Sequence, residues 1–78
     1  MIKENIIINL TRSEALVFFE WLASADDAGI FAPKMPDNTE QTVLWRIEGQ
    51  LESKLDEIVK PDYQDLVQAA KKEIAADK

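Results

Sequence analysis

The chain has 78 residues and contains neither cysteine nor histidine. We interpret residues 1–78 as a single small helical domain, which at this size buries only roughly 60% of the surface that its unfolded chain exposes. Its stability therefore depends on good packing or on self-association. The missing cysteines exclude disulfides and thiolate zinc sites, and the missing histidines exclude histidine-based triads and histidine-ligated metals.

Fifteen acidic and nine basic residues give a net charge of −6, spread along the whole chain. This balance disfavours nucleic-acid binding, because phosphates are bound by clusters of Lys and Arg. An acidic surface can attract a basic protein partner, although acidity that only keeps a protein soluble is the simpler interpretation. The apolar start is too short for a secretory signal, and no stretch could span a bilayer. We therefore expect a cytoplasmic protein without a membrane partner.

The first predicted element is a β-strand over residues 5–10, because three consecutive isoleucines give a β-branched run of strand length. A lone strand leaves amide and carbonyl groups unpaired. One hypothesis is a symmetric homodimer in which two copies pair these strands antiparallel. The interface residues would be Ile6, Ile7, Ile8, Val17 and Trp21. The alternatives are that the segment folds back on its own helices or pairs with residues 30–32.

A first helix is predicted from about residue 12 to residue 27, because Thr11 and Glu14 have the spacing of a capping box. Gly29 follows the expected end of this helix. We interpret Asp26 and Asp27 as that helix end, because the other ligands of a cation loop are missing. The predicted core face consists of five apolar residues, Ala15, Phe18, Phe19, Leu22 and Ala25.

A loop with two prolines follows over residues 30–38, and its apolar residues predict that it closes one end of the core. The second helix is expected to begin near Asp37, which has capping-box spacing to Glu40, and to continue to about Val59. Gly49 lies in its middle, where the close approach of another backbone would explain a glycine. The predicted core stripe of this helix is Leu44, Ile47, Leu51, Leu55 and Ile58.

Pro61 ends the second helix, and Asp62 is a candidate cap for a third helix. The apolar stripe of that third helix is Tyr63, Leu66, Val67, Ala70 and Ile74. The predicted fold class is mainly α, with an N-terminal β-strand followed by a three-helix bundle.

The best candidate for a site is one shoulder of the second helix, where Trp45, Glu48 and Glu52 lie beside the core stripe. Tryptophan offers a large contact area, and carboxylates accept hydrogen bonds from Arg or Lys of a partner. The alternative is that Trp45 only seals the core edge, while the glutamates form a solvated face supported by Lys54 or Arg46.

Catalysis and metal binding are both disfavoured, so we predict no enzyme, no catalytic residue, no metal and no cofactor. Two carboxylates four residues apart, as at Glu48 and Glu52, could hold a hard cation. However, a calcium site needs a ligand-rich loop, and a di-iron site in a helical bundle needs histidine. Acid–base catalysis by a carboxylate pair needs a cleft, for which a three-helix domain has little room.

The sequence resembles a family of short, uncharacterised bacterial helical proteins, and the likeness covers most of the chain. The matching residues are Leu10, Thr11, Glu14, Ala15, Trp21, Leu22, Leu44, Trp45, Glu48, Leu51, Glu52 and Tyr63. The resemblance implies an intracellular bacterial or phage origin and a small helical fold. It carries over no activity and no catalytic residue.

Two functions follow from these observations as hypotheses. The first is a non-enzymatic, acidic protein-binding module, such as an inhibitor or immunity-type protein that covers a basic surface of its partner. The second is a structural or regulatory homodimer that associates through the N-terminal strand.

Overall fold

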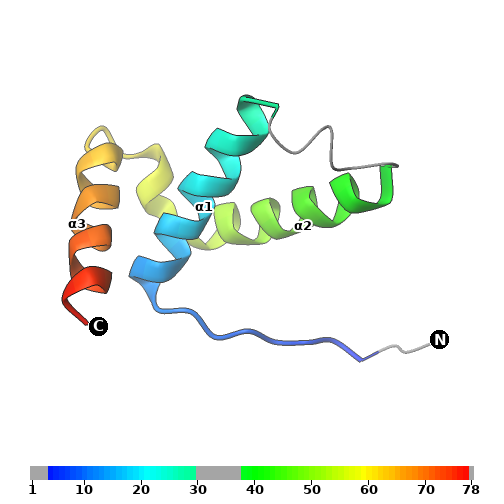
Figure 1. Cartoon of the computed structure of the whole chain (residues 1–78), viewed down its shortest axis with the longest axis horizontal. Coiled ribbons are helices and arrows are strands. Elements are labelled where there is room, and N and C mark those ends of the chain that lie inside the picture. The colour runs from blue at the N-terminus through cyan, green and yellow to red at the C-terminus, as the bar shows by residue number, and fades with distance from the viewer. Residues whose placement is uncertain (1–3, 30–37, 78) are drawn as a thin grey trace.

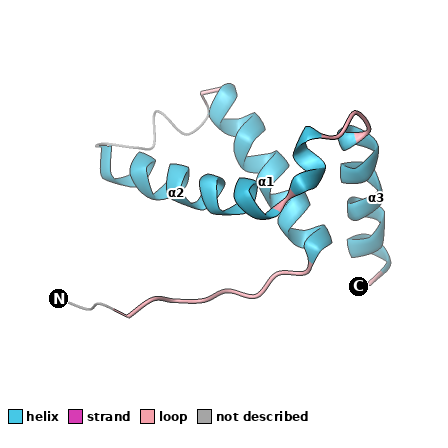
Figure 2. Cartoon of the chain, turned by 180° about the vertical axis from the view of Figure 1, so that it is seen from behind, coloured by secondary structure: helices cyan, strands magenta, loops and turns pink. Residues whose placement is uncertain are grey.

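The structure is a computed structural model that describes residues 4–29 and 38–77. It confirms the predicted mainly α architecture, because the chain forms a three-helix bundle (Figure 1). In the described ranges, which Figure 2 colours by secondary structure, no residue belongs to a β-strand. The elements are α1 at Arg12–Asp27, α2 at Asn38–Lys54, a short 3₁₀ helix η2 at Asp56–Val59, and α3 at Tyr63–Ala76.

The start of α1 confirms the predicted capping box. The backbone N–H of Glu14 donates to Thr11 Oγ1 at 3.1 Å, and the backbone N–H of Thr11 donates to Glu14 Oε1 at 2.8 Å. These two bonds satisfy donors that the first helical turn leaves free, and they fix the direction in which the chain enters the helix. At the other end, Gly29 has a φ of +71°, a left-handed conformation that glycine adopts without strain.

The second helix ends earlier than predicted, at Lys54 instead of Val59. The backbone leaves the helical conformation at Leu55, with φ −113° and ψ 88°, and turns into η2. Arg12 holds this turn. Its guanidinium donates to the carbonyl oxygen of Lys54 at 3.3 Å, to Asp56 at 2.7 Å and to Glu57 at 2.6 and 2.8 Å. From this turn the side chain of Leu55 enters the core, as the predicted stripe required, although the helix itself has already ended.

Helix α3 runs antiparallel to α1. Near one end of the pair, the hydroxyl of Ser13 donates to Glu73, and further along, the hydroxyl of Tyr63 donates to Glu20 Oε1 at 2.8 Å. Burial and the Glu20 carboxylate both raise the pKa of Tyr63, so its hydroxyl stays protonated and remains a donor. Asp62 does occupy the N-cap position of α3, but its side chain forms no capping hydrogen bond, contrary to the prediction.

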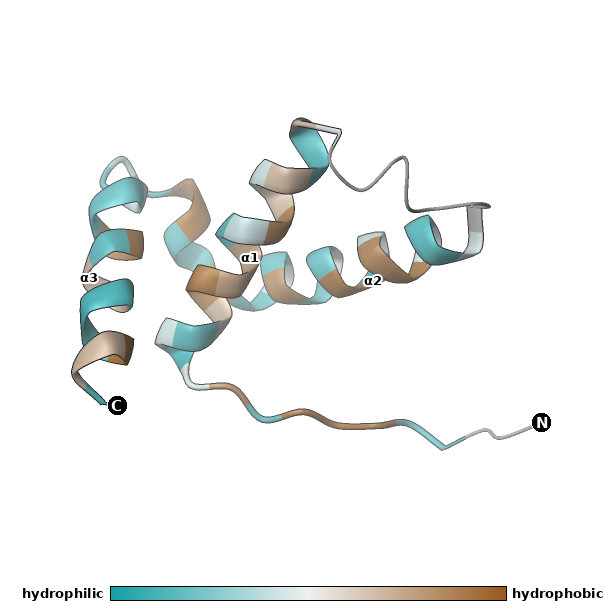
Figure 3. Ribbon diagram, viewed as in Figure 1, coloured by the Kyte–Doolittle hydropathy of each residue, from teal (hydrophilic) through white to brown (hydrophobic). Residues whose placement is uncertain are grey.

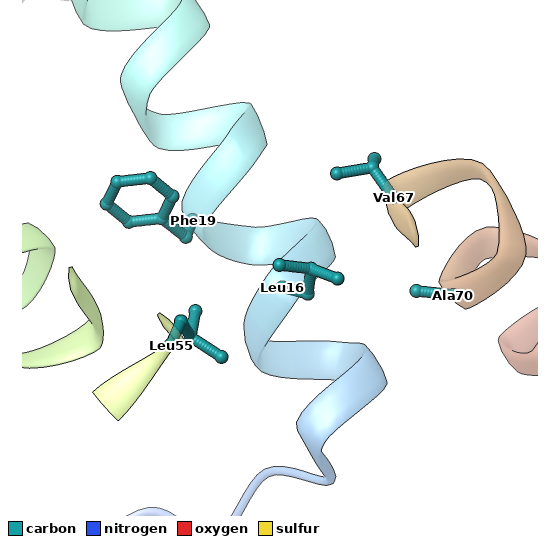
Figure 4. Close-up of a cluster of buried hydrophobic side chains, with 5 residues drawn as sticks. All are labelled: Leu16, Phe19, Leu55, Val67 and Ala70. Atoms are coloured by element: carbon teal, nitrogen blue, oxygen red, sulfur yellow. The ribbon is translucent and has the colours of Figure 1, made fainter. Parts of the chain in front are cut away.

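The core lies where α1, α3 and the turn after α2 meet (Figure 4). Leu16 lies between Leu55 on one side and Ala70 of α3 on the other. Because two elements cover α1 from different sides, Leu16 is buried, while the predicted core residue Phe18 is 37% exposed. The buried hydrophobic residues are Leu16, Phe19, Leu22, Ala25, Leu55, Val67 and Ala70.

Helix α2 contributes less to this core than its stripe predicts. Leu44 and Leu51 are half-buried, and Ile47 is exposed. The position of Gly49 faces open space, so the expected close approach of another backbone is wrong for the described structure. The predicted capping residue Asp37 and the predicted core-closing loop lie outside the described residues. None of the helices in the described part of the chain is long and apolar enough to cross a membrane.

The predicted strand over residues 5–10 is wrong for the single chain. The segment is extended but unpaired, and in Figure 1 it leaves the first turn of α1 and runs away from α3. Ile6, Ile7 and Ile8 are 88%, 83% and 77% exposed, so the segment does not fold back on its own helices either. A β-strand needs the backbone of a partner strand, and the described part of a single chain offers none. The alternative partner, residues 30–32, lies outside the described residues.

Candidate functional site

The three predicted site residues extend from the middle of α2 to its last turn, and the first of them, Trp45, lies beside the C-terminal end of α1. The indole N–H of Trp45 donates to Asp26 Oδ2 at 3.3 Å, and its side chain remains 53% exposed. Glu48 is half-buried and Glu52 is exposed. We refer to Trp45, Glu48 and Glu52 together with Asp26 and Asp27 as the Trp45 face.

The environment of the Glu48 carboxylate is unfavourable for its ionised form. Its Oε1 atom is buried and has no hydrogen-bond partner within the described chain. Burial raises the pKa of Glu48, and the negative charges of Asp26, Asp27 and Glu52 raise it further. The ionised carboxylate of Glu48 is therefore unfavourable in the isolated chain.

The end of α1 adds to the negative potential of the Trp45 face. The C-terminus of a helix carries a partial negative charge, which favours basic residues in the last turn. The last turn of α1 has no basic residue and ends with Asp26 and Asp27. The two aspartates and the helix dipole thus both make the electrostatic potential at this end of α1 more negative. A cationic group at this position would be attracted by both.

The alternative interpretation of Trp45, Glu48 and Glu52 agrees only in part with the structure. Trp45 does contact α1 and Glu52 is exposed, but Glu48 is half-buried, with its Oε1 atom out of contact with solvent. Among the described residues, neither Lys54 nor Arg46 forms an ion pair with these glutamates, and the ion pairs found join Arg12 to Asp56 and Glu57. No group of three or more acidic side chains in the described part converges closely enough to hold a metal ion.

Asp26 and Asp27 were missed as members of this site. From the sequence they are explained as a helix end, and only the packing of α2 against α1 brings them to Glu48. The signal that could have identified them is their position, because two acidic residues in the last helical turn oppose the helix dipole. Such a placement does not stabilise the helix.

The second predicted surface, the homodimer interface, lies in two separate places. Ile6, Ile7 and Ile8 belong to the N-terminal segment, residues 4–10, most of which Figure 3 shows as hydrophobic. Val17 and Trp21 lie on α1, where Val17 is half-buried and Trp21 is 56% exposed. The structure of one chain therefore does not bring these two groups together.

Val17 and Trp21 line an open groove of about 500 Å³ between α1 and α3, which we call the α1–α3 groove. Phe18 and Ile74 complete its apolar lining, and its polar lining consists of Glu14, Glu20, Ser24 and Lys71. The rings of Phe18 and Trp21 stack with their centroids 6.4 Å apart and an angle of 13° between their planes. Sequence reasoning missed the contribution of α3, because it depends on the antiparallel packing of α1 and α3.

Comparisons with protein-family models, with curated proteins and with solved structures gave no match to this chain. The resemblance to short bacterial helical proteins therefore rests on the sequence pattern alone.

Proposed function

We propose that this chain is a non-enzymatic protein-binding module whose Trp45 face covers a basic surface of another protein, as an inhibitor or immunity-type protein does. One observation carries the proposal, namely the half-buried carboxylate of Glu48 among three other acidic residues. A guanidinium or ammonium group from a partner would supply the positive charge and the hydrogen-bond donor that Glu48 lacks in the isolated chain.

Trp45 gives this surface a contact that does not depend on charge. Its exposed ring presents the large, rigid area typical of residues that dominate binding energy at protein interfaces. Its hydrogen bond to Asp26 holds the ring in place, so little side-chain freedom is lost on binding. The net charge of −6 would also steer a basic partner toward the chain.

The proposal is tested by affinity capture from the source cells, with the proteins retained at physiological salt quantified by mass spectrometry. The bait variant E48Q/E52Q changes the Trp45 face, and the control E40Q/D65N removes two exposed acidic groups elsewhere. Both variants have a net charge of −4 instead of −6, since each loses two negative charges. We expect a basic protein that the wild type and the control retain and E48Q/E52Q loses. Equal retention by all three baits would contradict the proposed surface.

The same carboxylate predicts an effect on stability in the absence of any partner. The folded pKa of Glu48 lies above its usual value, so ionisation of Glu48 weakens the fold at neutral pH, and this penalty is lost as the pH falls from the folded pKa to the usual value of 4.5. We expect E48Q to raise the thermal midpoint at pH 7 by roughly 2–4 °C, the effect of about 0.5 kcal/mol in a domain of this size.

The matched control for this measurement is E40Q. Glu40 is exposed in the first turn of α2, where a negative charge is favourable to the helix dipole. E40Q should therefore leave the midpoint unchanged or lower it slightly. A midpoint that falls in E48Q would show that the Glu48 carboxylate stabilises the isolated chain, and the proposal would lose its main support.

A second candidate function is a structural or regulatory homodimer, which the exposed N-terminal segment favours. Three adjacent isoleucines more than 75% exposed are costly to hydrate, and contiguous exposed apolar surface of this kind usually serves association. The small core of this chain gives association a second benefit, because buried interface area would add to stability. A strictly monomeric mass at high micromolar concentration would contradict this candidate.

A further inference from the structure

The N-terminal segment has two chemically different faces. In an extended chain, successive side chains point to opposite sides. Ile6, Ile8 and Leu10 therefore share one entirely apolar face, and Ile7 lies on the other face between two asparagines, Asn5 and Asn9. Such a pattern fits an extended segment that lies on an apolar surface with its other side toward water.

The α1–α3 groove has the dimensions and lining that such a segment needs. The α1 residues along it extend from Glu14 to Ser24, a span of roughly 15 Å at 1.5 Å per helical residue. Seven extended residues reach about 23 Å, enough to fill the whole groove. The half-buried Val17 and the stacked Phe18 and Trp21 give it an apolar wall.

The structure directs the N-terminal segment of each chain away from its own groove. The capping box fixes the backbone at Thr11, which has an extended conformation with φ −65° and ψ 162°. From there the segment runs away from α3, whereas the groove lies between α1 and α3 (Figure 1). To enter its own groove, the chain would have to reverse at Leu10 and Thr11 and give up the hydrogen bond from the N–H of Thr11 to Glu14.

We propose that the α1–α3 groove binds the N-terminal segment of a second copy of this chain, in a reciprocal exchange that forms a homodimer. Ile6, Ile8 and Leu10 of each copy enter the groove of the other copy. One edge of the backbone of the exchanged segment stays open to water, which hydrates the N–H and C=O groups along that edge. This inference rests on the self-association proposed above and specifies where each segment binds.

Reciprocal exchange also increases the buried surface area of the dimer toward the value that a stable interface needs. Specific interfaces bury roughly 1,200 Å² or more in total. A single segment in a single groove is a small contact, but a symmetric dimer contains this contact twice. The dimer buries apolar residues that are exposed in the single chain. These are Ile6 and Ile8 of the segment and Trp21 of the groove.

The first test is the molar mass of the full chain in solution, measured by sedimentation equilibrium over a range of concentrations. We expect a concentration-dependent mass that approaches twice 8.9 kDa. The variant I8K places a charge on the face that enters the groove, and it should raise the dissociation constant roughly 100-fold, because the contact occurs twice. The control N9K places the same charge on the neighbouring, outward-facing residue and should leave the association nearly unchanged.

The second test locates the segment by cross-linking, for which a chain without cysteine is well suited. A chain carrying I7C, at the centre of the segment, is mixed with a chain carrying S24C, which lines the groove, and treated with a short bismaleimide. We expect a cross-link between the two chains. S53C, an exposed serine on α2, is the matched control and should not react with I7C.

The outcomes separate the groove from self-association itself. A monomeric mass at all concentrations overturns both proposals. A dimer that persists in I8K, or that cross-links I7C to S53C in preference to S24C, overturns the groove but leaves self-association intact. Efficient cross-linking of I7C to a second I7C, without reaction at S24C, also overturns the groove and instead supports antiparallel pairing of the two segments.

Discussion

Just over half of the residues are apolar both in helix α3 and in the N-terminal segment, yet the apolar side chains are buried in one region and exposed in the other. Val67 of α3 is 1% exposed, while Ile7 of the segment is 83% exposed. Helix α3 lies against α1, and two side-chain hydrogen bonds, from Ser13 and from Tyr63, join the two helices. The three isoleucines of the N-terminal segment remain more than 75% exposed, so no element of the described chain covers them. An apolar stripe thus becomes a core only where a second surface faces it.

Thr11 marks the boundary between these two regions. Its capping box begins α1 on one side and sets the direction of the free segment on the other. Residues only a few positions apart along the chain therefore differ strongly in burial, as Leu16 at 4% and Leu10 at 43% exposure do.

The largest expected effect comes from truncating a leucine on each side of this boundary. L16A removes a side chain that lies between Leu55 and Ala70, and we expect it to lower the free energy of unfolding by roughly 3 kcal/mol. L10A makes the same chemical change in the exposed segment and should cost less than about 0.5 kcal/mol in the monomer. Urea unfolding at low micromolar concentration measures both. Similar losses in the two variants would show that the segment packs on its own chain.

A smaller effect is expected at the boundary itself. T11A removes the hydroxyl that accepts from the backbone N–H of Glu14, and it should cost about 1 kcal/mol. T11S keeps the hydroxyl and should remain close to the wild type. Thermal unfolding followed by far-UV circular dichroism measures the difference. If T11A and T11S were equally stable, the cap would not hold the start of α1, and the direction of the N-terminal segment would no longer be fixed.

The smallest effect concerns the ion pairs that join the start of α1 to η2. Arg12 lowers the pKa of Glu57 to about 2. Because this folded pKa lies below the usual value, the stabilisation is fully present above about pH 4.5 and is lost as the pH falls toward 2. Arg12 is largely open to solvent, which screens the pair, so we expect E57Q to lower the thermal midpoint at neutral pH by only about 2–4 °C.

The pH series provides the control for E57Q. The difference between wild type and variant should shrink as the pH falls from 4.5 and vanish near pH 2. It should also shrink at high salt, since exposed charges are screened. A difference that is independent of pH would assign the effect to packing rather than to charge.

Local signals in the sequence predicted the helices well, because they depend on neighbouring residues. The capping box at Thr11, the left-handed Gly29 and the stripe of α3 are all of this kind. The break at Leu55 could not be predicted, because Arg12 stabilises it from more than forty residues away. The burial of Leu16 in place of Phe18 likewise depends on which sides of α1 are covered.

In the candidate site, too, the sequence predicted the local features but not those that depend on the packing of distant segments. The sequence predicted that Trp45, Glu48 and Glu52 share one side of a helix, because a helical period determines it. It did not predict that Asp26 and Asp27 lie close enough to Glu48 to raise its pKa, because that depends on how α1 and α2 pack. The strand prediction is wrong for the single chain, because the β-branched run indicates strand propensity but cannot show whether a backbone partner is present.

Helix α2 differs from the other two helices because none of its described side chains, residues 39–54, is buried. Most of the stability of a helix in a protein comes from the packing of its side chains. Segments with few buried contacts therefore unfold locally without global unfolding. The amide protons of the first half of α2 should therefore exchange with solvent deuterium faster than those of α1. Trp45 lies in this half of α2. A partner that binds the Trp45 face would therefore slow amide exchange there, and this slowing would allow its binding to be detected.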